Sequence, residues 1–207
     1  VFLALALEDV FYLPASARLG DDKEAAVFGV AQRNAPLPAG PSLESIKKCI
    51  AKGGVSGECL DGLFGKFFDG GGTTAEALAS IREYEANDLD FRYSCHPVMH
   101  AIGRETFKKY PTVHESFRLC DQTCHSGCYH GAMEKFLRGD TASSDEAGHI
   151  SAEELQKKVV SACDSGQPTR LYFQCLHGLG HAVQFFLNYK LERALGTCDL
   201  LPDQWSR

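Results

Sequence analysis

Histidines that recur four residues apart are the feature of this sequence that could carry chemistry. Residues four apart on a helix lie on one face, with about 6 Å between their Cβ atoms, so two such side chains can chelate one metal ion or offer one ligand to each of two. If helices aim three such pairs at a common interior, five imidazoles and one carboxylate converge there. The pairs are His96 and His100, His130 and Glu134, and His177 and His181.

The ligand types indicate a transition metal. Imidazole suits iron, copper, zinc and nickel, and mixed histidine and carboxylate sets suit iron and manganese. We therefore expect a mono- or dinuclear site, with iron or copper favoured over zinc. A redox or oxygen-dependent oxidoreductase is the preferred activity. A hydrolase, which would use the metal to lower the pKa of a bound water to about 7, is the less favoured alternative.

The ligand pattern resembles that of a known class of metal proteins. Pairs of the form His-x3-Glu and His-x3-His are similar to those of hemerythrin-like di-iron helical bundles. The similarity covers the six positions named above and no others. The repeat and the cysteines described below depart from that family, so neither its fold nor its oxygen-carrying role is transferred.

Glycines beside these histidines predict that something approaches the helices closely. Gly131 and Gly178 directly follow two of the histidines, and Gly180 precedes His181. A glycine inside a helix costs about 1 kcal/mol relative to alanine, so its presence needs a reason such as a neighbouring backbone or a ligand. The alternative interpretation is tight helix packing, with the histidines capping helices or hydrogen-bonding in the core.

The remaining histidines fall outside this pattern. His114 and His149 are expected on the surface. His125 has Asp121 four residues before it as a companion, and its role is open.

The elements that must position these residues are expected to be helices. Apolar residues recur at helical spacing and strand-like alternation is nearly absent, which predicts an all-α chain. Ser42, Thr74 and Ser151 are expected helix N-caps, the last with Glu154 in a capping box, and residues 139–148 form a polar loop. The expected helices are 43–52, 55–68, 75–86, 96–109, 113–119, 129–137, 152–162, 171–188 and 191–197.

Four segments can be laid over one another and predict a helix-hairpin repeat. Asp61, His96, His130 and His177 occupy one equivalent position, at intervals of 35, 34 and 47 residues. Such units bury their apolar faces against neighbours, in a solenoid-like array or an irregular bundle. The first unit has Asp61 and Gly65 where the others have ligands, so we expect it outside the metal site. Chance similarity of short strings is the alternative.

Nine cysteines favour an oxidising compartment, whether the chain is secreted, periplasmic or in an organelle lumen. Disulfides that close turns between successive units would stabilise the fold by about 2–4 kcal/mol each, and an odd count leaves one thiol over. The favoured turn-closing pairs are Cys49/Cys59, Cys120/Cys128 and Cys163/Cys175, while Cys95 and Cys124 pair or stay free. The alternative set pairs residues across hairpins, as Cys95/Cys120, Cys128/Cys163 and Cys175/Cys198.

Two other uses of the central cysteines are weaker. Cys124, His125, Cys128 and His130 have the ligand types for zinc, but their spacing lacks the usual paired knuckles. Cys120-x3-Cys124-His125 is one residue too long for the usual c-type haem attachment.

Composition limits the partners and the domain plan. A net charge of −6 over 207 residues argues against nucleic acids and anionic membranes as partners, and no apolar run reaches the ~18 residues of a membrane span. We expect an irregular, proline-rich arm at 1–41 and a helical-repeat domain at 42–207. The rival to a metal protein is a non-catalytic, disulfide-stapled scaffold, or a subunit that meets a protein complex through this arm.

Overall fold

The computed structural model describes residues 40–53, 56–139 and 151–201, and this part of the chain folds into helices joined by turns. No strand occurs within these residues, which confirms the all-α class. The chain divides into two units, Val1–Pro36 and Leu37–Arg207. The first unit, and most of the loop expected at 139–148, lie outside the described residues.

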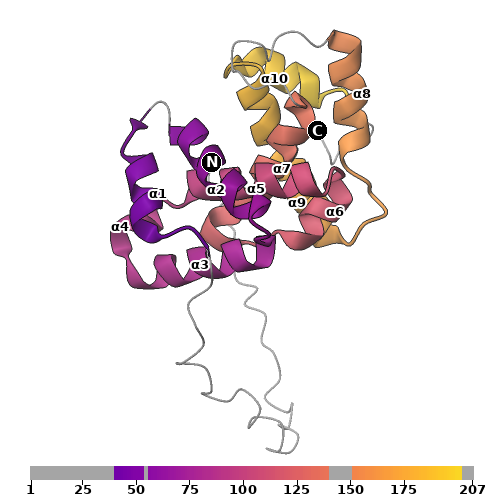
Figure 1. The fold of residues 1–207 in the computed structure, drawn as a ribbon. Helices are drawn as coiled ribbons and strands as arrows, with labels where there is room; N and C mark the ends of the chain where they lie inside the picture. Colours follow the sequence, from indigo (N-terminus) through magenta and orange to yellow (C-terminus); the bar gives the residue numbers. More distant parts are fainter. Residues whose placement is uncertain (1–39, 54–55, 140–150, 202–207) are drawn as a thin grey trace, which may run out of the picture. The chain divides into compact units, whose positions relative to one another are not determined.

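Nine of the helices correspond to expected ones, and α4 is additional (Figure 1). Helix α4 has six residues and one buried side chain, that of Phe91, so apolar periodicity could not reveal it. In chain order the helices are α1 (Leu43–Ile50), α2 (Ser56–Asp69), α3 (Thr74–Asn87), α4 (Leu89–Ser94), α5 (His96–Lys109), α6 (Val113–Leu119), α7 (Thr123–Arg138), α8 (Ala152–Ala162), α9 (Thr169–Phe186) and α10 (Leu191–Cys198).

Side-chain caps fix where several helices begin. The hydroxyls of Ser42 and Ser151 accept backbone N–H bonds at the starts of α1 and α8, as expected. The expectation for α3 is wrong by one residue: Thr73, not Thr74, is the N-cap, and it forms a reciprocal capping box with Glu76. Thr74 is instead buried, because its side chain faces the core.

Helix α7 begins with an irregular segment and therefore starts earlier than expected. Cys124, His125 and Ser126 have φ values of 47°, 58° and 65°, which place all three in the left-handed region. That conformation costs about 1–2 kcal/mol per residue for side chains other than glycine. Surrounding structure must hold this segment in place, and Cys124 is tied to Cys95 by a disulfide.

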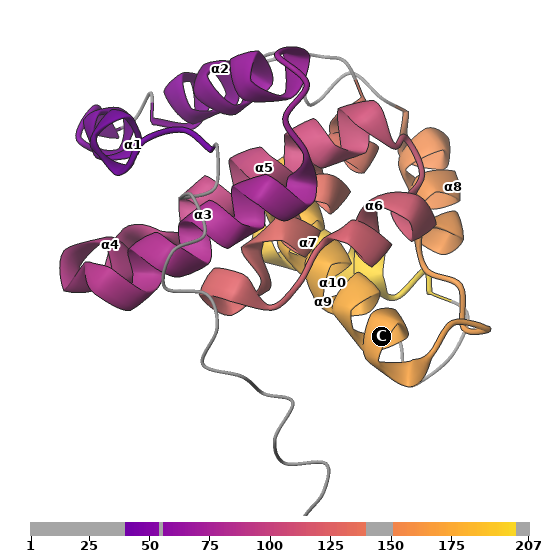
Figure 2. The same cartoon turned by 60° about the horizontal axis from the view of Figure 1, so that its bottom comes forward.

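Helices α5, α7 and α9 carry the histidines, and they pack against one another in that order. Helix α5 lies on α7, α7 lies on α9, and α2 covers α5 (Figure 2). Large apolar side chains fill the interfaces. Those that are fully buried on these helices include Met99, Ile102, Tyr129, Met133, Leu137 and Leu179.

Glycines let α5 and α7 approach closely. A Cβ at Gly131 would overlap the carbonyl oxygen of His100, and one at Gly103 would overlap that of Cys128. The close approach expected at Gly131 is therefore confirmed, and its partner is the α5 backbone. At Gly178 a Cβ would make only ordinary contact with a backbone oxygen 3.4 Å away. At Gly180 nothing described lies within 4 Å of a Cβ, so no neighbouring backbone approaches this glycine.

Four disulfides join cysteines of the described residues, with Cα–Cα distances of 5.4–5.8 Å that suit the bond. Three of them close turns between successive helices, and the fourth uses the two remaining internal cysteines. The across-hairpin alternative is wrong. The pairs are Cys49–Cys59, Cys95–Cys124, Cys120–Cys128 and Cys163–Cys175, and Cys198 is the free thiol. The helix-hairpin repeat itself stays a prediction.

Within the described residues, no helix combines the length and apolar character that crossing a membrane requires.

Candidate metal centre

Five imidazoles from three helices converge around His130. Its ring centroid lies 5.1 Å from that of His96 and 5.4 Å from that of His100, both on α5. The same centroid lies 4.8 Å from that of His177 and 4.3 Å from that of His181, both on α9. Histidines that lie 30 to 51 residues from His130 in the sequence thus share one site with it.

The five histidines form two groups that could each hold a metal ion, and His130 belongs to both. In each group, one ligand atom from each of three residues lies within 4.8 Å of the other two. The groups are His96, His100 and His130, and His130, His177 and His181.

Distances between ring nitrogens match those of shared metal ligands. The Nε2 atoms of His96 and His100 lie 3.0 Å apart, and those of His177 and His181 lie 3.1 Å apart. Nδ1 of His130 lies 3.4 Å from Nε2 of His96. Two nitrogens that each bind one tetrahedral ion at about 2.0–2.1 Å lie about 3.3 Å from each other. The rings therefore need little movement to take up an ion.

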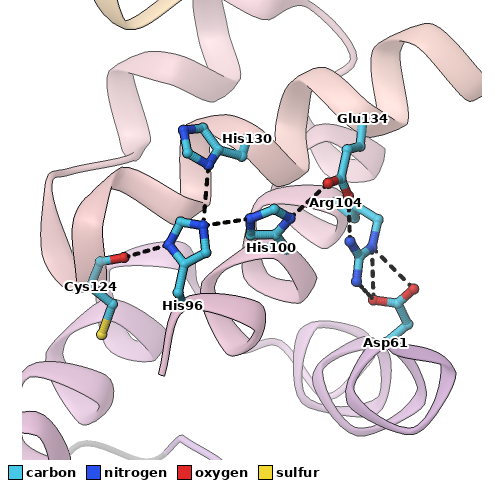
Figure 3. A network of polar contacts seen from close by, with 7 residues as sticks. All are labelled: Asp61, His96, His100, Arg104, Cys124, His130 and Glu134. Carbon is cyan, nitrogen blue, oxygen red and sulfur yellow. Dashed lines mark hydrogen bonds and ion pairs between the residues drawn. The ribbon is translucent and has the colours of Figure 1, made fainter. Parts of the chain in front are cut away.

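The tautomer of His96 follows from its other ring nitrogen. Nδ1 of His96 lies 2.9 Å from the carbonyl oxygen of Cys124, and because a carbonyl only accepts, this nitrogen is the donor (Figure 3). Nε2 of His96 then carries a lone pair, which points towards His100 and His130.

The tautomer of His100 is set by a carboxylate. Nδ1 of His100 lies 2.7 Å from Oε1 of Glu134. Burial would raise the pKa of Glu134, but the hydrogen bond from His100 and the charge of Arg104 outweigh burial and lower this pKa to about 2. Glu134 is thus ionised and can only accept, so Nδ1 of His100 donates to it.

Arg104 connects this carboxylate to helix α2. Its Nη1 donates to Oε2 of Glu134 at 2.6 Å, and its Nη2 donates to Oδ1 of Asp61 at 2.7 Å (Figure 3). Both oxygens of Glu134 are therefore engaged, one by His100 and one by Arg104. Glu134 is one of the six expected ligands, but it belongs to neither three-histidine group. It contacts the site through its hydrogen bond with His100.

Arg104 belongs to the hydrogen-bond network of the site and was not expected from the sequence, although its spacing is a usable signal. It lies four residues after His100 and eight after His96, so all three project from one face of α5. Asp61 was expected to lie outside the site, and it does not belong to either histidine group. Its bond to Arg104 nevertheless joins the first of the four segments to the site's hydrogen-bond network.

Burial keeps the central histidine neutral. His130 is 2% exposed, and desolvation, aided by the neighbouring histidines, lowers its pKa to about 3. Burial also lowers the pKa of His96 and that of His181. Neutral imidazoles are the form that binds metal, so these residues need not lose a proton at neutral pH before they do so.

One nitrogen of His130 is buried without a partner. Its Nε2 makes no hydrogen bond to any described residue. An unsatisfied polar atom in the interior costs about 1–3 kcal/mol, and such atoms in native proteins call for an explanation such as an ion.

The site is open on one side. His177 and His181 are exposed, whereas His96 and His100 are half-buried and His130 forms the base. A metal bound there would remain accessible to solvent from the side of α9.

Among the described residues, the other cysteine and histidine groupings considered do not make a metal centre. Disulfides engage Cys120, Cys124 and Cys128, so the zinc and haem interpretations of that segment are wrong. A third group that brings Glu85 near two cysteines fails for the same reason. His114 and His125 are exposed and belong to neither group, and the expectation for His149 falls on a residue outside those described.

Comparisons of the chain with protein-family models, with curated proteins and with solved structures found no match.

Proposed function

We propose that this chain binds a transition metal through its converging histidines and uses the metal in redox chemistry. The observation that carries the proposal is the meeting of two lone pairs. With both Nδ1 atoms committed as donors, Nε2 of His96 and Nε2 of His100 face each other 3.0 Å apart, and two neutral rings would meet there through their lone pairs with no proton between them. This repulsive arrangement is relieved by a cation that accepts both.

A proton is the competing cation, because a charged His100 could donate its second N–H to His96. The buried Nε2 of His130 favours the metal, since a proton shared by His96 and His100 leaves that nitrogen without a partner. A metal ion binds several lone pairs at once.

Copper is the metal that the donor set favours. All five converging donors are imidazoles, and divalent copper binds nitrogen ligands most tightly among the first-row divalent metals. Iron is less favoured than the sequence predicts, because the carboxylate that would suit iron is occupied by His100 and Arg104. Zinc shares the preference for imidazole and is the closest competitor.

Access to the site supports reactivity over a purely structural metal. Structural sites surround their ion with protein ligands, whereas reactive sites keep a position open. The exposed His177 and His181 leave such an opening, through which a small oxygen-containing ligand could reach the metal. Four disulfides fit a secreted, periplasmic or lumenal setting, in which thiols oxidise.

The proposal is tested by elemental analysis of the full purified chain, followed by titration with Cu²⁺ and with Zn²⁺. We expect stoichiometric metal, lost in the double variant His130→Ala/His177→Ala and kept in the control His114→Ala. Native protein that binds neither metal, and whose melting temperature does not change on adding a chelator, would instead support the scaffold function.

A further inference from the structure

We infer that His130 bridges two metal ions, one at each of its ring nitrogens, so that the centre is dinuclear. The inference rests on the proposed function, because it concerns how the same histidines divide between ions. Its premises are the membership of His130 in both three-histidine groups and the different surroundings of its two nitrogens.

The two ring nitrogens of His130 cannot serve the same ion. They lie at different edges of the imidazole ring, and the directions in which they can form bonds diverge. Nδ1 faces the α5 pair, 3.4 Å from Nε2 of His96 (Figure 3). Nε2 is the buried atom that no described residue satisfies. An ion bound at Nδ1 alone would leave Nε2 without a partner, whereas a second ion could bind at Nε2.

The supply of ligands supports the same division. His96 and His100 offer facing nitrogens near Nδ1 of His130, and His177 and His181 offer a second pair of facing nitrogens that forms its own three-histidine group with His130. Each ion would receive two nitrogens from its own helix and one from His130. Three protein ligands with a fourth position open is the arrangement of reactive metal sites.

The bridge forms by exchange of one proton. Neutral imidazole carries one N–H and one lone pair, and the first divalent ion binds at the lone pair. When the second ion binds, the remaining N–H bond breaks, a nitrogen–metal bond forms, and the proton passes to water. No electron is transferred, and the ions come from solution.

Titration of the full chain with Cu²⁺, followed by copper analysis and electron paramagnetic resonance, tests the bridge. We expect two copper ions per chain, with a signal well below that of two isolated Cu²⁺ ions because the bridging ring couples their spins. One ion per chain, or two with full uncoupled intensity, would overturn the bridge and leave the proposed function intact. No bound copper would overturn both.

Two variants separate the bridge from a loss of folding. His130→Gln should abolish the coupled state. Because His130 is buried, the second variant changes the exposed pair, His177→Gln/His181→Gln, which should bind one copper with the full intensity of an isolated ion. A coupled pair that persists in either folded variant contradicts the bridge, and His114→Gln is the matched control.

Discussion

Nδ1 of His100 donates to a carboxylate oxygen of Glu134 over 2.7 Å, and this bond leaves Nε2 as the nitrogen that His100 presents to the metal site. Arg104 holds the second oxygen of the same carboxylate at 2.6 Å. A carboxylate in this position orients the ring and makes the ligating nitrogen more basic. With a metal bound as proposed, Glu134 would act on it through His100, and Asp61 is linked to this arrangement through Arg104.

Replacing Glu134 should weaken metal binding without removing the site. Glu134→Gln keeps the shape of the side chain but removes its charge, so we expect about a 10–100-fold loss of metal affinity with unchanged stoichiometry. Isothermal titration with Cu²⁺ measures both quantities. Glu153→Gln, on the exposed start of α8, is the control and should leave both unchanged. Equal effects of the two substitutions would show that Glu134 does not contribute to metal affinity.

The close approach of α5 and α7 predicts opposite effects of two glycine substitutions. Gly131→Ala places a methyl group against the carbonyl of His100, so we expect a loss of about 1–3 kcal/mol in the free energy of unfolding and weaker metal binding as the helices separate. Gly180→Ala meets open space on the exposed side of α9 and should stabilise by about 1 kcal/mol. Urea denaturation of both metal-free variants measures the difference. A stable Gly131→Ala variant would show that this contact does not set the helix spacing.

The disulfide Cys95–Cys124 should support the site as well as the fold. It anchors the left-handed segment from which the carbonyl of Cys124 accepts the N–H of His96. We expect Cys95→Ser/Cys124→Ser to lower stability by about 2–5 kcal/mol and to reduce metal affinity in the molecules that remain folded.

The disulfide Cys49–Cys59 provides the comparison. It links α1 to α2, neither of which carries a histidine, so Cys49→Ser/Cys59→Ser should lower the melting temperature with much less effect on metal affinity. Melting curves and copper titrations of both double variants make the test. Equal losses of affinity would mean that the carbonyl of Cys124 does not position His96.

The histidine cluster could be anticipated because a four-residue spacing on helices fixes which side chains share a face. That periodicity also identified nine of the helices, and the short intervals between cysteines favoured the turn-closing disulfides. Local spacing does not reveal which residues a carboxylate contacts on other helices. The partners of Glu134 come from Arg104 on α5 and, behind it, Asp61 on α2, and that arrangement depends on how the helices pack. The left-handed start of α7 also escaped prediction, because tertiary bonds impose it against local preference.

The buried state of His130 predicts that the metal-free protein loses stability in acid. Its pKa is about 3 in the folded protein against 6.5 for the free side chain, so the unfolded chain takes up a proton as pH falls below 6.5 while the folded chain does not. Stability should therefore fall from pH 6.5 towards pH 3. At 1.36 kcal/mol per pH unit, His130 alone contributes a loss of about 2 kcal/mol by pH 5. Urea denaturation at pH 7 and pH 5, with chelator present, should show a smaller loss for His130→Gln, whose remaining slope comes from His96 and His181. An equal loss in both proteins would mean that His130 is not the residue that resists protonation.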